Sequence, residues 1–347
     1  MKVRTLAFLY NVRHLYPDPE DPRSQLEVDF DDPPVIESMI KHFKNLGYKV
    51  IPIEANEEAY LKLYRDRKQI DFAFDFSFGL YGEYKYCHVP AMLEMLQIPF
   101  TGSSSFVRAL TLNKVKMKQI FLANDVSTLP YQLFESADIT LNQKLHFPLI
   151  VKPVAQGSSA GITVKSIVHN LINLKKRVNY ILKTFNQPAF VEPFLKWREF
   201  SVAMLGNPPR ILPIIEPDFT RLPKGYLPFD SIEVKWVYED SSSSNHLVCP
   251  AKVDKALRLK IEDLSLKTWK ALDIRDLCRI DMREDKDGVL YVLDVNVPPG
   301  LLPPDVSPWS YFPIACRAVG IEYEEMLEMI INSALKRYAI TNKTDVR

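Results

Sequence analysis

The first hundred residues alternate between apolar runs of strand length and a helical periodicity. Arg4–Tyr10, Tyr48–Ile53 and Ile70–Phe76 are short apolar runs, which favours strands, and the first of them is interpreted as a β-strand and not as a signal peptide. Gly47 closes a segment whose apolar residues share one helical face: Val35, Ile36, Met39, Ile40, Phe43 and Leu46. A shorter helix is expected over His88–Leu96. This order predicts a parallel sheet in an N-terminal α/β domain.

Two further blocks of strands and helices follow. Helices are expected from Thr111 to about Asn124, over Leu171–Phe185 and, with a long amphipathic pattern, over Val253–Leu272. The expected strands are Pro148–Lys152, Ile162–Lys165, Ala189–Phe194 and Glu199–Leu205. The serine run Ser241–Ser244 is interpreted as a mobile loop. We therefore expect an α/β protein of three domains, residues 1–109, 110–206 and 207–347.

One hairpin combines this patterning with candidate chemistry. The segment Leu277–Gly300 reads as two strands joined by a turn at Asp287-Gly288. Asp294 and Asn296 are two residues apart, so both side chains leave the same face, and Asp281 comes from the neighbouring strand. Oxygen ligands of this kind suit Mg²⁺, which takes one or two carboxylates and leaves other positions to phosphate and water. The alternative is an ordinary hairpin whose acids face solvent.

Composition and charge narrow the classes of function. The net charge is +1 and the lysines form no sustained basic stripe, which argues against nucleic acid or an anionic membrane as a partner. No apolar run approaches membrane-spanning length. The four cysteines lack metal-ligand spacing, which indicates free thiols in a reducing compartment and a cytoplasmic protein: Cys87, Cys249, Cys278 and Cys316.

A second candidate site lies between Leu149 and Val164. An apolar strand ends at Lys152 and is followed by small residues, Gly157 to Gly161. Glycine N–H groups and serine hydroxyls can surround phosphates, and the lysine supplies a positive charge. No Walker A sequence or GxGxxG is present, and a flexible hairpin loop is the alternative. Further on, Glu192 and Glu199 flank Leu195 in a segment that could read an adenine edge and ribose hydroxyls, although single glutamates are usually solvated.

These segments occur in a recognisable order: NKVKMK, VKPVAQGSSAGI, VEPFLKWREF, CRIDM and LDVNVPPG, preceded by PFTGSSSFVRALTLNK. Together they resemble an ATP-grasp carboxylate–amine ligase, most closely the D-alanine–D-alanine ligase family. The resemblance implies an N-terminal parallel-sheet substrate-side domain followed by the two-lobed α+β ATP-grasp fold. The central lobe would carry a glycine-rich lid, and the C-terminal lobe would carry the metal and acceptor site.

The resemblance also implies roles for individual residues. Lys114 and Lys152 would contact the ATP phosphates, and Lys235 would reach the γ-phosphate from a loop. The remaining nucleotide-binding residues would be Gly157, Ser158, Ser159, Glu192, Leu195 and Glu199. Two Mg²⁺ ions, with Mn²⁺ as an alternative, would be held by Asp281, Asp294 and Asn296. Arg279 and the backbone at Gly300 would stabilise an oxyanion, and Ser310 would contact the second substrate's carboxylate.

The implied reaction is ATP-dependent peptide-bond formation through an acyl phosphate, with release of ADP and phosphate. The substrates would be amino acids or small peptides, and a homodimer is suggested. One alternative is that the protein is not an enzyme but a non-catalytic ATP-binding regulatory module. If it is an enzyme, the alternative is a ligase strictly specific for two D-alanines.

Four departures from the family pattern concern the substrates and the metal. The usual glycine-rich start is missing, and either Glu27 or Asp29 could supply the acid expected there. Trp236 stands where a tyrosine is expected and cannot accept a hydrogen bond. The stretch after Gly300 is longer than usual. Asp294 replaces the usual bridging glutamate and has a shorter reach. The nucleotide half is thus expected to be intact, whereas the substrates need not be two D-alanines.

Overall fold

The computed structural model describes residues 4–21, 23–239 and 246–344, and it begins with the predicted parallel sheet. The sheet has the order β2-β1-β3, with strands β1 Thr5–Tyr10, β2 Lys49–Glu54 and β3 Phe72–Asp75. Phe100 adds a parallel bridge at Ala73, beside β3. The expected helices are present as α1 Pro33–Asn45 and α3 His88–Met95, whereas α2 Ala59–Asp66 was not predicted.

The helix predicted from Thr111 is interrupted. The structure instead has α4 Ser105–Leu112 and α5 Lys114–Ala123, separated at Asn113. Asn113 has extended backbone angles, and its side chain accepts a hydrogen bond from Lys116 N at 3.0 Å, which makes it the N-cap of α5. The break changes the direction of the chain before it enters the central sheet.

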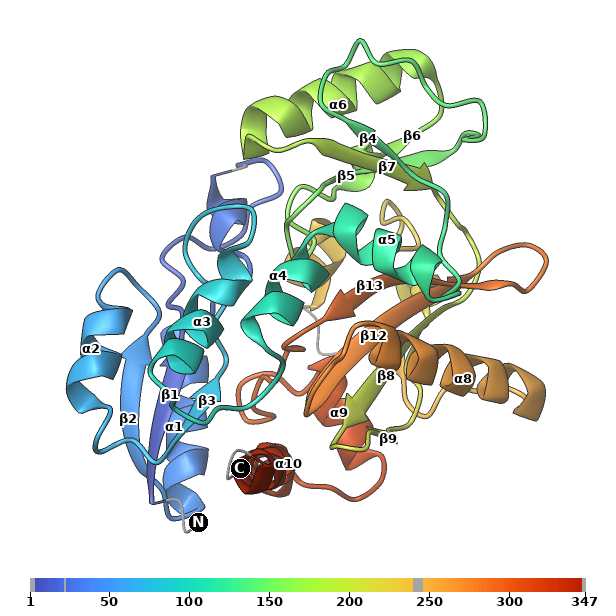
Figure 1. Cartoon of the computed structure of the whole chain (residues 1–347). Helices are drawn as coiled ribbons and strands as arrows, with labels where there is room; N and C mark the ends of the chain where they lie inside the picture. Colours follow the sequence, from blue (N-terminus) through green and yellow to red (C-terminus); the bar gives the residue numbers. More distant parts are fainter. Residues whose placement is uncertain (1–3, 22, 240–245, 345–347) are drawn as a thin grey trace.

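The central sheet is antiparallel and has the order β4-β7-β5-β6, with α6 Leu171–Phe185 packed along it (Figure 1). Its strands are β4 Gln132–Phe134, β5 Leu149–Pro153, β6 Ile167–Val168 and β7 Ala189–Pro193. The strand predicted over Ile162–Lys165 is wrong. Thr163 and Ser166 form a capping box that starts a short helix η3, Val164–Ser166, so the strand begins only at Ile167.

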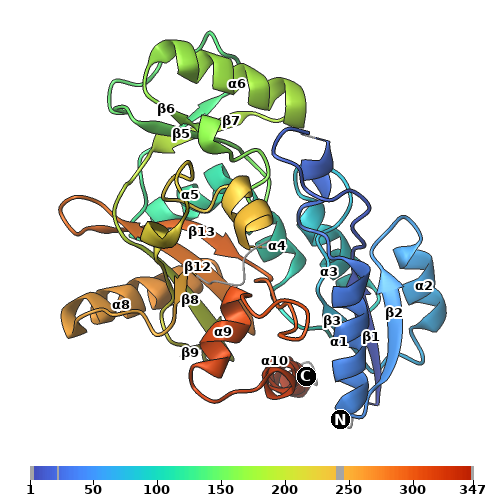
Figure 2. The same cartoon turned by 180° about the vertical axis from the view of Figure 1, so that it is seen from behind.

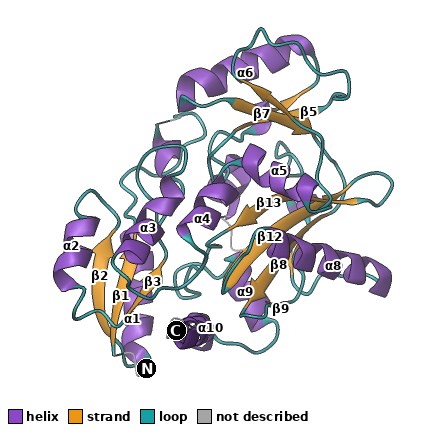
Figure 3. Cartoon of the chain, viewed as in Figure 1, coloured by secondary structure: helices purple, strands orange, loops and turns teal. Residues whose placement is uncertain are grey.

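The C-terminal sheet is also antiparallel, with the order β13-β12-β8-β9 and with α8 Lys255–Ala271 alongside (Figures 1 and 3). Its strands are β8 Glu199–Leu205, β9 Arg210–Ile211, β12 Leu277–Glu284 and β13 Leu290–Asn296. The predicted hairpin is confirmed, with Asp281 opposite Asp294 and Arg279 opposite Asn296. Because β8 pairs with β12, this sheet takes a strand from before residue 207. The three-domain division stays a prediction.

Several shorter elements connect these sheets and helices. A two-stranded ladder joins β10 Glu216–Pro217 to β11 Leu247–Val248. The short helices are η1 Ser24–Glu27, η2 Lys85–Cys87, η4 Phe219–Arg221 and the π-helical η5 Val234–Tyr238. The serine run Ser241–Ser244 lies outside the described residues.

One of the C-terminal helices joins the N-terminal sheet to the C-terminal sheet. α9 spans Tyr311–Arg317, and α10 spans Tyr323–Thr344 and lies between the N-terminal and C-terminal sheets (Figures 1 and 2). Asp276 is fully buried and accepts hydrogen bonds from Gly102 N at 2.8 Å and from Arg337 of α10 at 2.8 Å. Arg337 also donates to the Phe100 carbonyl at 3.0 Å. One buried aspartate therefore joins the edge of the parallel sheet, α10 and the C-terminal sheet.

In the described parts of the chain, none of the helices combines the length and the apolar character that crossing a membrane requires.

Candidate active site

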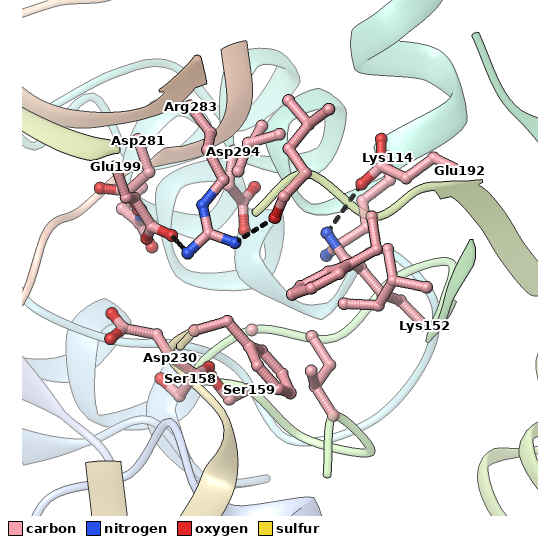
Figure 4. Close-up of a pocket in the computed structure, with 18 of the residues that line it drawn as sticks. Lys114, Lys152, Ser158, Ser159, Glu192, Glu199, Asp230, Asp281, Arg283 and Asp294 are labelled. Carbon is pink, nitrogen blue, oxygen red and sulfur yellow. Dashed lines mark hydrogen bonds and ion pairs between the residues drawn. The ribbon is translucent and has the colours of Figure 1, made fainter. Parts of the chain in front are cut away.

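A pocket opens between the central and C-terminal sheets, and residues from both line it (Figure 4). β5 and β7 supply Lys152 and Glu192, while β12 and β13 supply the acidic hairpin residues. The pocket brings together these predicted residues: Lys114, Lys152, Gly157, Ser158, Ser159, Glu192, Leu195, Glu199, Lys235, Arg279, Asp281, Asp294 and Asn296. Segments that lie more than a hundred residues apart in the sequence thus line one pocket, as the family resemblance implies.

Two lysines contact the carboxylate of Glu192, and a third, Lys114, belongs to the same wall of the pocket. Its oxygens lie 2.7 Å from Lys118 Nζ and 2.8 Å from Lys152 Nζ. Burial alone would raise the pKa of Glu192, but the two ammonium groups outweigh it and hold the pKa at about 2. Lys114 Nζ donates to the Gln156 carbonyl at 2.8 Å, and burial lowers its pKa. The result is a compact cationic wall built around one internal anion.

The structure adds Lys118 to the residues predicted for this site. The motif NKVKMK holds three lysines, and only Lys114 was predicted for the site. Lys114 and Lys118 are four residues apart and both are buried, whereas Lys116 is exposed. The i, i+4 spacing on α5 was the signal that could have identified the inward pair.

The glycine-serine loop is positioned against the N-terminal domain. A Cβ at Gly157 would collide with the Tyr86 hydroxyl and would lie 2.6 Å from Asp29 Oδ1, so a larger residue would require these two side chains to move. Ser158 and Ser159 have left-handed φ angles of 45° and 64°. The loop therefore presents small residues and backbone groups to the pocket, as a phosphate-binding loop requires.

The residues predicted to hold Mg²⁺ form a hydrogen-bonded cluster. Asp281 accepts a bidentate pair from Arg279 at 2.9 Å for each bond, and it also accepts from Asn296 Nδ2 at 2.8 Å and Ser201 Oγ at 2.6 Å. Burial would raise the pKa of Asp281, but Arg279 and Ser201 bring it below its usual value. Because Asn296 donates through its amide nitrogen, its amide oxygen is left for another partner. With Asp294 the cluster is an all-oxygen donor set, which fits Mg²⁺.

Glu199 has a partner that sequence reasoning missed. Arg283 lies 2.6 Å from Glu199 Oε2 and donates to the Leu195 carbonyl at 2.8 Å and the Pro228 carbonyl at 2.7 Å. Burial raises the pKa of Glu199 to about 7 against the pull of Arg283. Arg283 follows Asp281 by two residues on β12, and this spacing was the available signal.

The predicted loop lysine, Lys235, lines both this pocket and a neighbouring cavity. Lys235 is part of η5, and its Nζ lies 3.7 Å from Asp230 Oδ2. Ser159 Oγ donates to the Asp230 carbonyl at 2.7 Å, and Trp236 Nε1 donates to the Ser158 carbonyl at 3.3 Å. Trp236 therefore acts as a hydrogen-bond donor to the glycine-serine loop. The tryptophan side chain cannot accept a hydrogen bond, but this contact requires only a donor.

A wider cavity of about 540 Å³ adjoins the first pocket. Gly300 and Ser310 line it, and Arg279 lines both cavities. Ser310 Oγ donates to the Gly300 carbonyl at 3.1 Å and accepts from Leu302 N at 3.2 Å, which fixes the turn after β13. All the residues predicted from the sequence thus line one of two connected cavities.

The two acids left open in the N-terminal segment have different positions. Asp29 is buried, lines the wider cavity and lies 3.4 Å from Lys85 Nζ. Glu27 instead accepts the backbone N–H groups of His14 at 2.6 Å and Leu15 at 3.1 Å. Asp29 is therefore the acid that faces the cavity, whereas Glu27 organises a surface turn.

Comparisons with known proteins agree with this arrangement. The family model described as D-ala D-ala ligase C-terminus matches residues 113–332. An uncharacterized protein of Sinorhizobium fredii, y4sG, is 30% identical and covers 93% of this chain and 92% of its own length. The D-alanine–D-alanine ligase of Aquifex aeolicus is 30% identical, covering 85% of this chain and 92% of its own length.

Solved structures show the same architecture. The D-alanine–D-alanine ligase of Bacillus anthracis superposes with a TM-score of 0.71 at 25% identity, over 96% of this chain and 98% of that chain. A structure of the Bacillus anthracis ligase complexed with ATP gives a TM-score of 0.70 at 23% identity and shows the same fold. The predicted α/β architecture, an N-terminal parallel sheet followed by the ATP-grasp fold, is confirmed. With a family match over more than half of its residues, this chain belongs to the D-alanine–D-alanine ligase family.

Proposed function

We propose that the protein is an ATP-dependent carboxylate–amine ligase that forms an amide bond through an acyl phosphate. The observation that carries the proposal is the position of Arg279, which lines both the nucleotide pocket and the wider cavity. One cation can therefore face the transferred phosphoryl group and the carbonyl carbon that reacts next. The non-catalytic alternative is not favoured, because the curated relatives with named activities are ligases.

In the first step, a substrate carboxylate oxygen attacks the γ-phosphorus of ATP, and the bond from this phosphorus to the β–γ bridging oxygen breaks. Lys114, Lys152 and Lys235 are the residues we assign to the phosphate oxygens, and Ser158 and Ser159 to the loop over them. Bound Mg²⁺, held by Asp281, Asp294 and Asn296, would neutralise charge on the phosphates. Positioning and electrostatic stabilisation carry this chemistry, so no protein nucleophile is required.

In the second step, the nitrogen of an amine attacks the carbonyl carbon of the acyl phosphate, and phosphate leaves with the bridging oxygen. The attacking nitrogen loses a proton, and negative charge develops on the former carbonyl oxygen. Arg279 and the backbone at Gly300 are the groups we assign to this oxyanion. Ser310, hydrogen-bonded to the same turn, is assigned to the carboxylate of the amine substrate.

The substrates we propose are amino acids or small peptides, without a requirement for two D-alanines. The buried carboxylate of Asp29 at the cavity wall suits the ammonium group of such a substrate. A homodimer, a cytoplasmic location and the three-domain division at residues 109/110 and 206/207 belong to the same proposal. The four cysteines are free thiols, in agreement with a reducing compartment.

The test is a substrate panel. The protein is incubated with ATP, Mg²⁺ and pairs of D- and L-amino acids and dipeptides, and ADP and phosphate are measured together. We expect equal amounts of ADP and phosphate, released only when suitable substrates are present. ADP release that no member of the panel stimulates would contradict ligase activity, and activity with D-alanine but with no other member of the panel would contradict the proposed relaxed requirement.

A further inference from the structure

Three side chains that the proposed reaction does not use converge beside η5. They are Asp230, Glu239 and His246, and one donor atom from each lies within 4.8 Å of the others. Asp230 precedes η5, Glu239 follows it, and His246 immediately precedes β11. The cluster therefore joins two elements that are separated along the chain.

The donor atoms of this cluster are buried and lack hydrogen bonds within the described residues. His246 is 1% exposed, and neither of its ring nitrogens has a hydrogen-bond partner there. The same holds for Asp230 Oδ1 and Glu239 Oε1. Buried polar atoms normally have partners, so a group of them that faces a common point indicates a missing ligand.

The neighbouring side chains do not satisfy all the donor atoms that face the centre of the cluster. Tyr311 donates to Asp230 Oδ2 at 3.0 Å, and Lys235 lies 3.7 Å from the same oxygen, so Oδ1 is left over. Burial and the charge of Asp230 raise the pKa of Glu239 to about 8. Burial lowers the pKa of His246, which keeps its imidazole neutral and able to bind a metal at neutral pH.

One distance in the cluster fits a metal site directly. His246 Nε2 and Glu239 Oε1 are 3.6 Å apart, close to the spacing of two ligands that each lie about 2.0–2.2 Å from Zn²⁺ in tetrahedral geometry. His246 is held in place by its main chain, because its carbonyl accepts from Asp218 N at 2.7 Å beside the β10–β11 ladder. The position of the histidine is therefore fixed, and the two carboxylates come from residues on either side of η5 in the sequence.

We propose that Asp230, Glu239 and His246 form a binding site for a divalent transition metal ion of the Zn²⁺ or Co²⁺ type. A nitrogen ligand distinguishes this site from the all-oxygen set of Asp281, Asp294 and Asn296, which suits Mg²⁺. A bound ion ties η5, which carries Lys235 and Trp236, to β11. The ion thereby fixes the wall of the active site that carries the loop lysine.

The site can be tested by titrating the chelator-treated full-length protein with Co²⁺ and recording its visible absorption. We expect one equivalent to give the spectrum of four-coordinate Co²⁺, even with millimolar Mg²⁺ present. His246→Ala and Glu239→Gln should each weaken this binding at least about 100-fold, since even an outer-shell partner of a metal typically contributes 10–100-fold. His169→Ala, which changes an exposed histidine, is the matched control.

A second measurement separates loss of the metal site from loss of the fold. Melting curves of wild-type protein and of each variant are recorded with and without Zn²⁺, after circular dichroism has verified the fold. The proposal requires a Zn²⁺-dependent rise in Tm in the wild type that is lost in a folded Glu239→Gln or His246→Ala protein. A wild type without four-coordinate Co²⁺, or variants that retain wild-type Co²⁺ affinity, would overturn it. Asp294→Asn should leave the Co²⁺ spectrum unchanged, which separates this site from the Mg²⁺ site.

Discussion

The nucleotide half and the substrate half of the active site are built in different ways. In the nucleotide half, charged groups are already paired with one another: Glu192 with Lys118 and Lys152, and Glu199 with Arg283. The substrate half is a wider cavity whose wall includes Asp29, paired in the same way with Lys85, and also Asp31, one oxygen of which lacks a hydrogen-bond partner among the described residues. Burial raises the pKa of Asp31 to about 7. The first half is preorganised for one ligand, whereas the second leaves its selectivity to a few side chains.

The largest effect is expected at the residue that both halves share. Arg279→Gln should lower kcat by about 10³-fold, because the charge facing the developing oxyanion is lost. The ATP dissociation constant should change by less than tenfold. Steady-state kinetics and equilibrium nucleotide binding measure the two quantities, after circular dichroism has verified the fold, since Asp281 loses its bidentate partner. A kcat within tenfold of the wild type would remove Arg279 from the mechanism.

A smaller effect, confined to the nucleotide half, is expected for Lys152→Ala. Loss of this charge should reduce kcat/KM for ATP by about 10²-fold, in the range of a charge-assisted hydrogen bond to phosphate, while the KM of the amino-acid substrate stays within about threefold. Lys116→Ala on the exposed face of α5 is the matched control and should behave as wild type. Equal losses for both variants would show that general charge, and not the position of Lys152, is responsible.

A further prediction concerns Asp29, the buried acid in the wall of the substrate half. Asp29→Asn should raise the KM of the amine-bearing substrate by about tenfold, the value of one charge-assisted interaction, and should leave the KM of ATP unchanged. Glu27→Gln is the control, because Glu27 holds a surface turn and does not line the cavity. If Glu27→Gln had the larger effect on this KM, the assignment of Asp29 would be wrong.

The smallest effect is expected for a substitution at Asp294, one of the residues proposed to hold Mg²⁺. Asp294→Glu restores the longer carboxylate of the family pattern, and we expect the Mg²⁺ concentration for half-maximal rate to fall by about threefold, with little change in kcat. Rate measurements across a Mg²⁺ series provide the test. A rise in the required Mg²⁺ would indicate that the surrounding cluster is built for the shorter side chain.

Local patterns predicted much of the fold. The predicted ranges Leu171–Phe185 and Glu199–Leu205 match α6 and β8 to the residue, because each has a clear period and a defined end. The strand predicted over Ile162–Lys165 failed because side-chain capping by Thr163 and Ser166 overrode the apolar pattern. The break at Asn113 was missed for a similar reason.

The site residues that belong to sequence motifs could be predicted, whereas those brought to the site only by tertiary contacts could not. The motif residues all line the two cavities, although their individual roles stay predictions. Lys118 and Arg283 had usable spacing signals. Asp230 and Tyr311 had none, because their contact joins segments 81 residues apart outside any repeating pattern. The choice between Glu27 and Asp29 likewise required the three-dimensional path of an irregular segment.

The buried joint of Asp276 and Arg337 has a mechanical consequence. It fastens the parallel sheet and the C-terminal sheet to α10, so these parts should move as one rigid body. The central sheet is connected to that body by the stretches at residues 124–131 and 194–198, which contain no helix or long strand. A hinge is therefore expected in these two stretches. Motion at this hinge would open and close the pocket between the central and C-terminal sheets, and the loop with Gly157 and Ser158, which lines both cavities, would move with the central sheet.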